Sequence, residues 1–380
     1  MLKIISMSSL RPIWCLWFLL ICLSGFVISI CFHKWFPVIY HQPYLNRSYQ
    51  IVKSKQDPHH LLANINSSLT FLHSKKLFIS SSRFKKSHWM QKLMHHLQQH
   101  NSNQVILITA DHLYEDILFN WLAAAHLKAH ITTHDVLILS LDDILCQTLL
   151  GYDIETVCVR KHEVIDSSAG MHTSLSHVWI IRCMITRLLN YWGYDVLMFD
   201  LDAVLLKDPR PLFEQFRQSD IIGSQGKYPF ELSREWGGVT LCMGAVMFRS
   251  THQTAIFWEN SKLLHSNAQD DQVRVNELLH QSAIKWFVAK DCHGFSHCTV
   301  TGLTKEGLNV TLLSQDIICR QSCKKDHGYY IWHGRASRSN PSKMSKAREG
   351  GAWFLRKDWK KILHSTSVTG NDLIVKMSNE

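Results

Sequence analysis

Three short apolar runs stand out in the middle of the chain, and helical patterns separate them. The runs cover residues 105–109, 136–141 and 196–199. Each is continuous and bounded by polar residues, which is typical of strands buried on both faces. Apolar positions at helical spacing predict helices over 115–127 and 176–192, the second stopped at Gly193. This alternation predicts a mainly parallel α/β sheet flanked by helices.

Acidic residues follow each of these runs. Asp111, Asp142 and Asp200 stand within two residues of the predicted strand ends. Parallel α/β sheets bind ligands at the carboxyl ends of their strands. We therefore expect a ligand site at this edge of the sheet, with Asp111 among its contacts.

The segment YDVLMFDLDAVLLKDPRP, residues 194–211, carries the clearest chemical signal. In an extended chain, side chains two apart share a face, so Asp200 and Asp202 project together while Leu201 faces the core. Two adjacent carboxylates repel unless a cation or proton lies between them, and oxygen ligands at this separation suit Mn²⁺ or Mg²⁺. The alternative is an Asp pair that caps the next turn, but a cap does not need the second carboxylate. The segment therefore predicts a divalent metal site.

An uncharged stretch of 20 residues, 13–32, lies near the N-terminus between Arg11 and Lys34. Its length is about that of a membrane-spanning helix. A cleaved signal peptide would have a shorter apolar core ending in an A-x-A-like site, and the sequence has no such site here. We therefore expect a signal anchor over 13–32, a cytoplasmic tail over 1–12 and the rest of the chain in the lumen.

Composition divides the remainder into three parts. Residues 33–100 are polar, basic and His-rich, which is typical of a stem, with a helical stretch near 89–97. The buried patterns then predict one large domain over 101–363 and a C-terminal tail over 364–380. With 46% hydrophobic and 19% charged residues in 380, the chain is mostly globular, and fibrous, mini-scaffold and polytopic membrane classes are excluded. The net charge of +10 suits anionic ligands or membranes, and a luminal location excludes nucleic acid as a partner.

Sequons and cysteines agree with a luminal location. The N-x-S/T sequons lie at Asn46, Asn66 and Asn309. Eight of the eleven cysteines follow the anchor: Cys146, Cys158, Cys183, Cys242, Cys292, Cys298, Cys319 and Cys323. The last four form two close pairs that bridge either locally or to each other. Neither spacing is the C-x2-C of a zinc site, so disulfides are favoured.

Two enzyme classes place Asp-x-Asp after a buried strand. FDLDAV is similar to the FDLDGT-type motif of haloacid-dehalogenase-like phosphatases, in which Asp200 would be the nucleophile. That motif opens its domain, however, whereas two predicted strands precede it here, and Ala203 and Val204 replace Gly and Thr. In nucleotide-sugar-dependent glycosyltransferases of the GT-A fold, Asp-x-Asp comes late and its metal bridges the donor diphosphate. The order along the chain favours the transferase.

Residues 105–359 resemble the nucleotide-diphospho-sugar transferase domain of plant cell-wall xylosyl- and arabinosyltransferases and related Golgi α-galactosyltransferases. The matching motifs follow in order: Arg182 before Gly-Tyr-Asp-Val-Leu, the metal motif 200–209, Asp271 with Gln272 and Asn276, His333 in YYIWHGR, then Lys343 and Lys346. The resemblance implies a luminal GT-A glycosyltransferase domain over 101–363.

The resemblance also implies roles around the metal. Asp202 would bind the metal directly, and Asp200 would bind it through water or contact the ribose. His333 would complete the metal shell, with a satisfied core histidine as the alternative. Lys343 or Lys346 would contact the diphosphate as a compact charge on a flexible stem.

Two further assignments keep an alternative. Arg182 either contacts the donor or makes a structural ion pair. Asp271 lies in DDQVRVNELL, where acids favour the start of a helix. The resemblance instead makes Asp271 and Gln272 a sugar- or acceptor-binding pair near the anomeric carbon of a retaining enzyme, a place from which they could stabilise an oxocarbenium-like transition state.

One departure concerns the sugar. Where the family has Asn-x-Gly, this chain has Cys242-Met243-Gly244. Gly244 still permits close approach of a donor. The side-chain amide of the family's Asn is absent, however, so the resemblance does not predict which sugar is transferred. Four tryptophans either stack on a sugar or belong to the hydrophobic core: Trp236, Trp286, Trp332 and Trp353.

Together these features predict a single-pass type II protein of the Golgi membrane. It would transfer a sugar from a UDP-linked donor to a glycan or glycoprotein acceptor with retention, using Mn²⁺ or Mg²⁺. The rivals are a luminal phosphatase and a catalytically silent transferase-like binding subunit.

Overall fold

The computed structural model describes residues 87–100, 102–160, 174–261, 270–288, 295–320, 323, 327–334, 339–365 and 367–378. The predicted anchor over 13–32, most of the stem, Asn46, Asn66 and Cys292 lie outside these residues. Among the helices that the structure does describe, none is long and apolar enough to span a bilayer.

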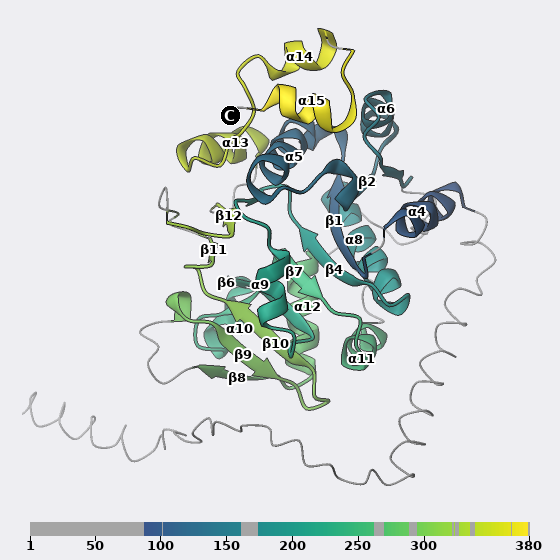
Figure 1. The fold of residues 1–380 in the computed structure, drawn as a ribbon. Coiled ribbons are helices and arrows are strands. Elements are labelled where there is room, and N and C mark those ends of the chain that lie inside the picture. The colour runs from purple at the N-terminus through teal and green to yellow at the C-terminus, as the bar shows by residue number, and fades with distance from the viewer. Residues whose placement is uncertain are drawn as a thin grey trace, which may run out of the picture. The chain divides into compact units, whose positions relative to one another are not determined.

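A nine-stranded sheet forms the centre of the described fold (Figure 1), in the order β3-β2-β1-β4-β7-β6-β10-β9-β8. Its strands are β1 (Gln104–Ala110), β2 (Val136–Ser140), β3 (Val157–Cys158), β4 (Asp195–Phe199), β6 (Ile221–Gly226), β7 (Thr240–Phe248), β8 (Lys285–Val288), β9 (Val300–Leu303) and β10 (Asn309–Leu313). The three apolar runs of the sequence are β1, β2 and β4, which are neighbours in this sheet.

The prediction of a mainly parallel sheet was wrong, because the sheet is mixed. Strands β3, β2, β1 and β4 run parallel, and β6 runs parallel to β10. Strand β7, however, lies antiparallel between β4 and β6, and β9 pairs antiparallel with both β10 and β8. A continuous apolar run indicates burial on both faces but not strand direction. All nine residues of β7 are buried, for example, although the strand runs antiparallel to both of its neighbours.

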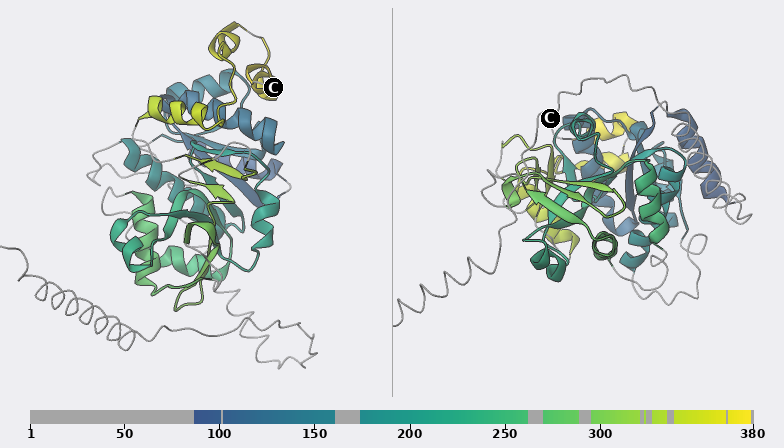
Figure 2. Two further views of the ribbon diagram at one scale, coloured as in Figure 1. Left: turned by 90° about the vertical axis from the view of Figure 1, so that its left-hand side faces the viewer. Right: turned by 90° about the horizontal axis from the view of Figure 1, so that it is seen from below.

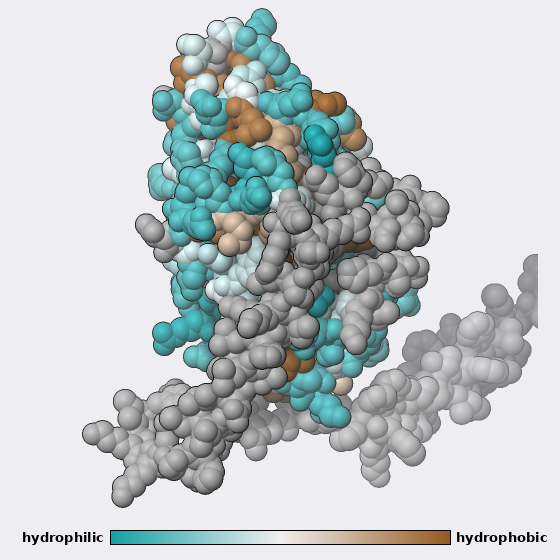
Figure 3. Space-filling model, turned by 90° about the vertical axis from the view of Figure 1, so that its right-hand side faces the viewer, coloured by the Kyte–Doolittle hydropathy of each residue, from teal (hydrophilic) through white to brown (hydrophobic). Residues whose placement is uncertain are grey.

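Helices cover both faces of the sheet (Figure 2). They are α4 (His88–Gln99), α5 (Glu115–Ala129), α6 (Asp143–Gly151), α8 (Ser174–Tyr191), α9 (Arg210–Gln215), α10 (Phe230–Glu235), α11 (His252–Asn260), α12 (Asp271–Gln281), α13 (Asn340–Glu349), α14 (Trp359–Ser365) and α15 (Gly370–Met377). Alternate residues of β1 belong to different apolar clusters: Ile106 and Ile108 pack with α5, Val105 and Leu107 with α8. The coloured part of the face drawn in Figure 3 is mainly hydrophilic, with apolar side chains in small groups.

Both ends of the domain extend beyond the predicted boundaries. Helix α4 falls in the predicted stem, yet its Trp89, Leu93 and Leu97 are buried in one of the two apolar clusters. Helix α15 falls in the predicted tail, yet it packs against α5 and buries Leu373 and Met377. These helices belong to the domain because their apolar faces complete its core.

A small second sheet, in the order β11-β12-β5, stands beside the large one. Its strands are β5 (Ala203–Leu205), β11 (Ile318–Cys319) and β12 (Ile331–His333). Disulfides join Cys146 to Cys158 and Cys319 to Cys323, so the second of the predicted pairs bridges locally.

Candidate functional site

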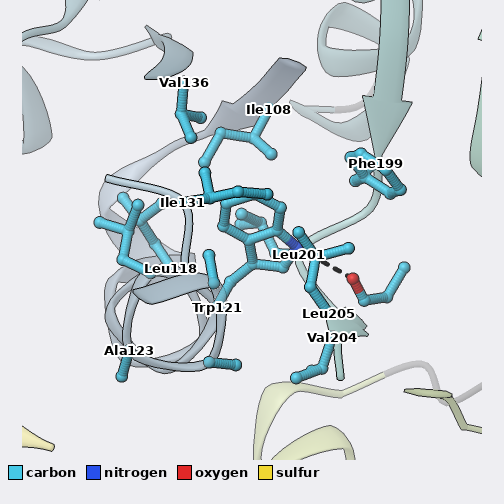
Figure 4. Packing of buried hydrophobic residues seen from close by; sticks show 14 of the residues in the cluster. Ile108, Leu118, Trp121, Ala123, Ile131, Val136, Phe199, Leu201, Val204 and Leu205 are labelled. Atoms are coloured by element: carbon cyan, nitrogen blue, oxygen red, sulfur yellow. Dashed lines mark hydrogen bonds between the residues drawn. The ribbon is translucent and has the colours of Figure 1, made fainter. Parts of the chain in front are cut away.

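The Asp200–Asp202 segment is a tight turn between β4 and β5. The N–H of Asp200 donates to the carbonyl of Gly244 (2.8 Å), and the N–H of Ala203 donates to the carbonyl of Asp200 (2.9 Å). Leu201 is buried, as the alternation predicted. Behind the turn, Trp121 of α5 donates from its indole nitrogen to the carbonyl of Ala203 (2.9 Å), which ties the turn to the core (Figure 4).

His333 reaches this turn through strand pairing. It is the last residue of β12 and lies opposite Ala203 of β5. Its Nε2 is 3.8 Å from Oδ2 of Asp200 and 3.8 Å from Oδ1 of Asp202. The three side chains offer ligand atoms that all lie within 4.8 Å of one another, so the structure brings the predicted metal ligands together.

This group has the properties of a divalent cation site. Within the described part of the chain, the buried Oδ1 of Asp202 has no hydrogen-bond partner, which is costly unless a cation takes that place. A Cβ on Gly244 would lie 1.9 Å from Cε1 of His333 and 2.8 Å from Oδ2 of Asp200, so only glycine leaves this space open. Two carboxylates and an imidazole therefore fit a cation such as Mn²⁺.

Electrostatics hold the ligands in their binding forms. Burial raises the pKa of Asp200, but Arg182, His333 and Lys343 outweigh it, and the pKa lies well below its ordinary value. Burial and the positive charge of Arg320 lower the pKa of His333 to about 3. Metal ligands must be deprotonated, and both groups are so near neutral pH.

Lys343 stands on the other side of Asp202. Its Nζ is 2.8 Å from Oδ2 of Asp202 and 5.6 Å from the centroid of the Tyr114 ring. Burial lowers the pKa of Lys343, but the two aspartates outweigh it and raise the pKa overall, so the ammonium stays charged. Lys346 is half-buried on the same helix, one turn later.

Arg182 connects the turn to the start of α12. Its Nε is 2.5 Å from Oδ2 of Asp271, and its Nη1 pairs with Oδ1 of Asp200. The sequence left open whether Arg182 contacts the donor or makes a structural ion pair, and the structure shows the ion pairs. Burial raises the pKa of Asp271 to about 6 against the effect of Arg182. Because its side chain is only 3% exposed, Asp271 acts on the site through Arg182.

Gln272 and Asn276 hold the backbone around the site. Gln272 accepts from the N–H of Met243 (3.3 Å) and donates to the carbonyl of Tyr228 (2.6 Å). Asn276 accepts from the N–H of Leu241 (2.9 Å) and donates to its carbonyl (2.8 Å). These bonds fix β7 to α12 where β7 bulges: Gly223 pairs with Val246 but the next residue, Ser224, with Cys242. The bulge carries Gly244 into the site.

Several other predicted residues have structural contacts. Asp111 caps the short helix at 112–114, accepting from the N–H of Leu113 (3.1 Å). Burial and Asp142 raise the pKa of Asp111. Asn309 begins β10, where its Nδ2 donates to the carbonyl of Gln218 (3.0 Å). Among the four tryptophans, Trp236 and Trp332 are buried core residues.

Arg320 is the site residue that the sequence did not reveal. It follows β11, and its Nη1 is 2.8 Å from Nδ1 and 2.5 Å from Nε2 of His333. No spacing rule marks it, because pairing of β11 with β12 brings Cys319 opposite Trp332 and so places Arg320 beside His333. Its only sequence signal is a cation directly after a short apolar strand.

Comparisons with known proteins identify the family of the chain. Residues 130–346, more than half of the chain, match the family model described as nucleotide-diphospho-sugar transferase. Mouse xyloside xylosyltransferase 1 is 12% identical over 61% of this chain and 97% of its own, with a TM-score of 0.35. The galactosyltransferase LgtC, solved with donor and acceptor sugar analogues, is 11% identical over 68% and 99%, with a TM-score of 0.39. No curated protein sequence matches. The match over residues 130–346 shows that the chain belongs to the nucleotide-diphospho-sugar transferase family.

Proposed function

We propose that this protein is a metal-dependent glycosyltransferase that moves a sugar from a UDP-linked donor to a glycan or glycoprotein acceptor. The observation that carries the proposal is the group formed by Asp200, Asp202 and His333, with one buried oxygen of Asp202 free of hydrogen bonds within the described residues. A silent binding subunit would have no need to keep this ligand set open beside Gly244.

In this proposal each residue has a defined task. Asp202 and His333 hold the cation, and Asp200 completes the site from its fixed position against Arg182. When bound, Mn²⁺ supplies Lewis-acid stabilisation of the departing nucleoside diphosphate. Lys343 adds a charged ammonium next to the ligands, where it neutralises developing charge on the diphosphate.

The sugar side of the site is assigned to the start of α12. Asp271 serves as a positioning residue, because its contact with the turn runs through Arg182. Gln272 is less buried than Asp271 and bonds to two backbone segments, which supports a position at the rim of the sugar site. We propose retention of anomeric configuration on the family resemblance.

The cellular location forms part of the same proposal. The apolar stretch 13–32 and the sequons at Asn46, Asn66 and Asn309 support a type II protein of the Golgi membrane with its catalytic domain in the lumen. The two disulfides within the described residues suit an oxidising compartment.

The variant Asp202→Asn tests the metal assignment. We expect it to keep the circular dichroism spectrum of the wild type and to lose Mn²⁺-dependent UDP binding and turnover, because an amide is a weaker ligand for a hard cation. Asp143→Asn is the matched control, since Asp143 is exposed and, among the described residues, its ion pair is with Arg160. An Asp202→Asn protein with most of its metal-dependent UDP binding would overturn the assignment.

A further inference from the structure

Arg320 differs from Arg182 and Lys343 in that it pairs with no carboxylate of the described residues. Arg182 pairs with two aspartates and Lys343 with one. No carboxylate within the described residues lies at ion-pair distance from Arg320, although the residue is half-buried. A guanidinium that is partly removed from water without a carboxylate favours an anionic ligand.

Among the described residues, Arg320 contacts the ring of His333, one of the proposed metal ligands. Its Nη1 faces both ring nitrogens of His333 and lies 2.5 Å from Nε2. The same Nε2 faces Asp200 and Asp202 at 3.8 Å. A single Nη1 this close to both ring nitrogens lies against the ring and not along the in-plane lone pair of either nitrogen. It nevertheless puts a guanidinium within a few ångströms of the place that a cation on Nε2 would take, so Arg320 and a metal oppose each other at His333.

The opposition between Arg320 and a bound metal is one of positive charges. A divalent cation at the ligands and a guanidinium a few ångströms away repel each other, and partial burial strengthens the repulsion. The positive charge of Arg320 also acts on Cys242 of β7, where it opposes the burial that raises the pKa of that thiol. An anion bound between the metal and Arg320 would remove the repulsion and use the planar fork of donors.

We propose that Arg320 occupies His333 in the metal-free protein, leaves it when the divalent cation binds, and then binds an oxyanion of the donor. This inference rests on the proposed function. The oxyanion is either a diphosphate oxygen or a carboxylate on the donor sugar. Arg320 would thereby make binding of metal and donor cooperative, since the donor relieves the repulsion that the metal creates.

Calorimetry on the full chain tests this with two titrations, Mn²⁺ alone and UDP-glucuronate, which carries both kinds of oxyanion, at saturating Mn²⁺. We expect Arg320→Gln to bind Mn²⁺ more tightly and UDP-glucuronate more weakly than the wild type, each by roughly 5- to 150-fold, the usual range of coupling between sites. Arg320→Lys keeps the charge but loses the fork, so its Mn²⁺ affinity should stay near wild type while UDP-glucuronate binding weakens. Arg217→Gln, an exposed charge removal before β6, is the control and should change neither.

The expected changes in affinity have opposite signs, tighter for Mn²⁺ and weaker for the nucleotide. A merely structural role of Arg320 would not produce this combination. Arg320→Gln with both affinities lowered, or both unchanged, would overturn the inference. Titrations with UDP-glucose and UDP-glucuronate distinguish the anions: equal losses assign a diphosphate oxygen, and a loss confined to UDP-glucuronate assigns a sugar carboxylate. If the wild type binds Mn²⁺ but no UDP, the proposed function fails, while the Mn²⁺ titrations still decide whether Arg320 competes for His333.

Discussion

Gly244→Ala inserts one methyl group into the space between the metal ligands. The new Cβ would lie 1.9 Å from Cε1 and 2.7 Å from Nε2 of His333, and 2.8 Å from Oδ2 of Asp200. Carbon atoms in contact are normally about 3.5–4.0 Å apart, so the ring must retreat by roughly 1.5 Å. Backbone pairing of β12 with β5 limits that movement. The substitution therefore disrupts the ligand geometry without removing a ligand.

The expected loss follows from this displacement. Disturbing the surroundings that orient metal ligands typically costs about 10- to 100-fold in metal affinity. We therefore expect Mn²⁺-dependent UDP binding, measured by calorimetry, to weaken by roughly that factor. Overpacking should also lower the free energy of unfolding by about 1–3 kcal/mol.

Gly223→Ala separates crowding from damage to the site. Its Cβ would lie 2.3 Å from Cδ1 of Leu241 and 3.4 Å from Val246, and none of its near contacts is a metal ligand. It should lose stability in thermal unfolding but keep UDP affinity. If Gly244→Ala binds UDP with Mn²⁺ within a few-fold of the wild type, the ligand arrangement described for His333 is incorrect.

Two further predictions concern the buried ion pairs. Arg182→Met leaves Asp200 and Asp271 without their shared cation, so thermal or urea unfolding should show a loss of about 3–5 kcal/mol; an unchanged midpoint would contradict the bridge. Because the pKa of Asp271 is about 6 in the folded state and 3.8 is its ordinary value, the folded state binds more protons between these values. Its contribution to stability is therefore full below pH 3.8 and is lost as pH rises through 6. Asp271→Asn should remove this component from the difference in stability between pH 4 and 7, and an identical pH profile would refute it.

The sequence predicted those parts of the fold that local patterns determine. The runs at β1, β2 and β4 are continuous and apolar, so burial on both faces was visible in them. The alternation of Asp200, Leu201 and Asp202 likewise predicted which side chains face the site. These features depend only on residues next to one another in the chain.

Features that depend on distant pairing were not predictable in the same way. The direction of β7 and the bulge at Gly244 follow from pairing with both β4 and β6. The disulfide between Cys146 and Cys158 depends on β3 joining the sheet next to β2. Helices α4 and α15 have apolar faces, but only the assembled core shows what those faces cover.

The residues of the site likewise differ in whether the sequence alone could reveal them. His333 could be proposed from a family resemblance, because a histidine after an apolar strand is a pattern in the sequence. Arg320 has no such pattern, and only the pairing of β11 with β12 brings it to His333. Arg182 was recognised, but its partners Asp200 and Asp271 are set by the packing of α8 between β4 and α12.

The most direct test of the account is thermal unfolding of the purified full chain with UDP, with Mn²⁺, and with both together. A ligand that binds only the folded state stabilises it by about 2.7 kcal/mol at a hundredfold excess over its dissociation constant. The account predicts a clear rise in the unfolding temperature only when UDP and Mn²⁺ are both present. An unfolding temperature that no nucleotide changes in the presence of Mn²⁺ would contradict it.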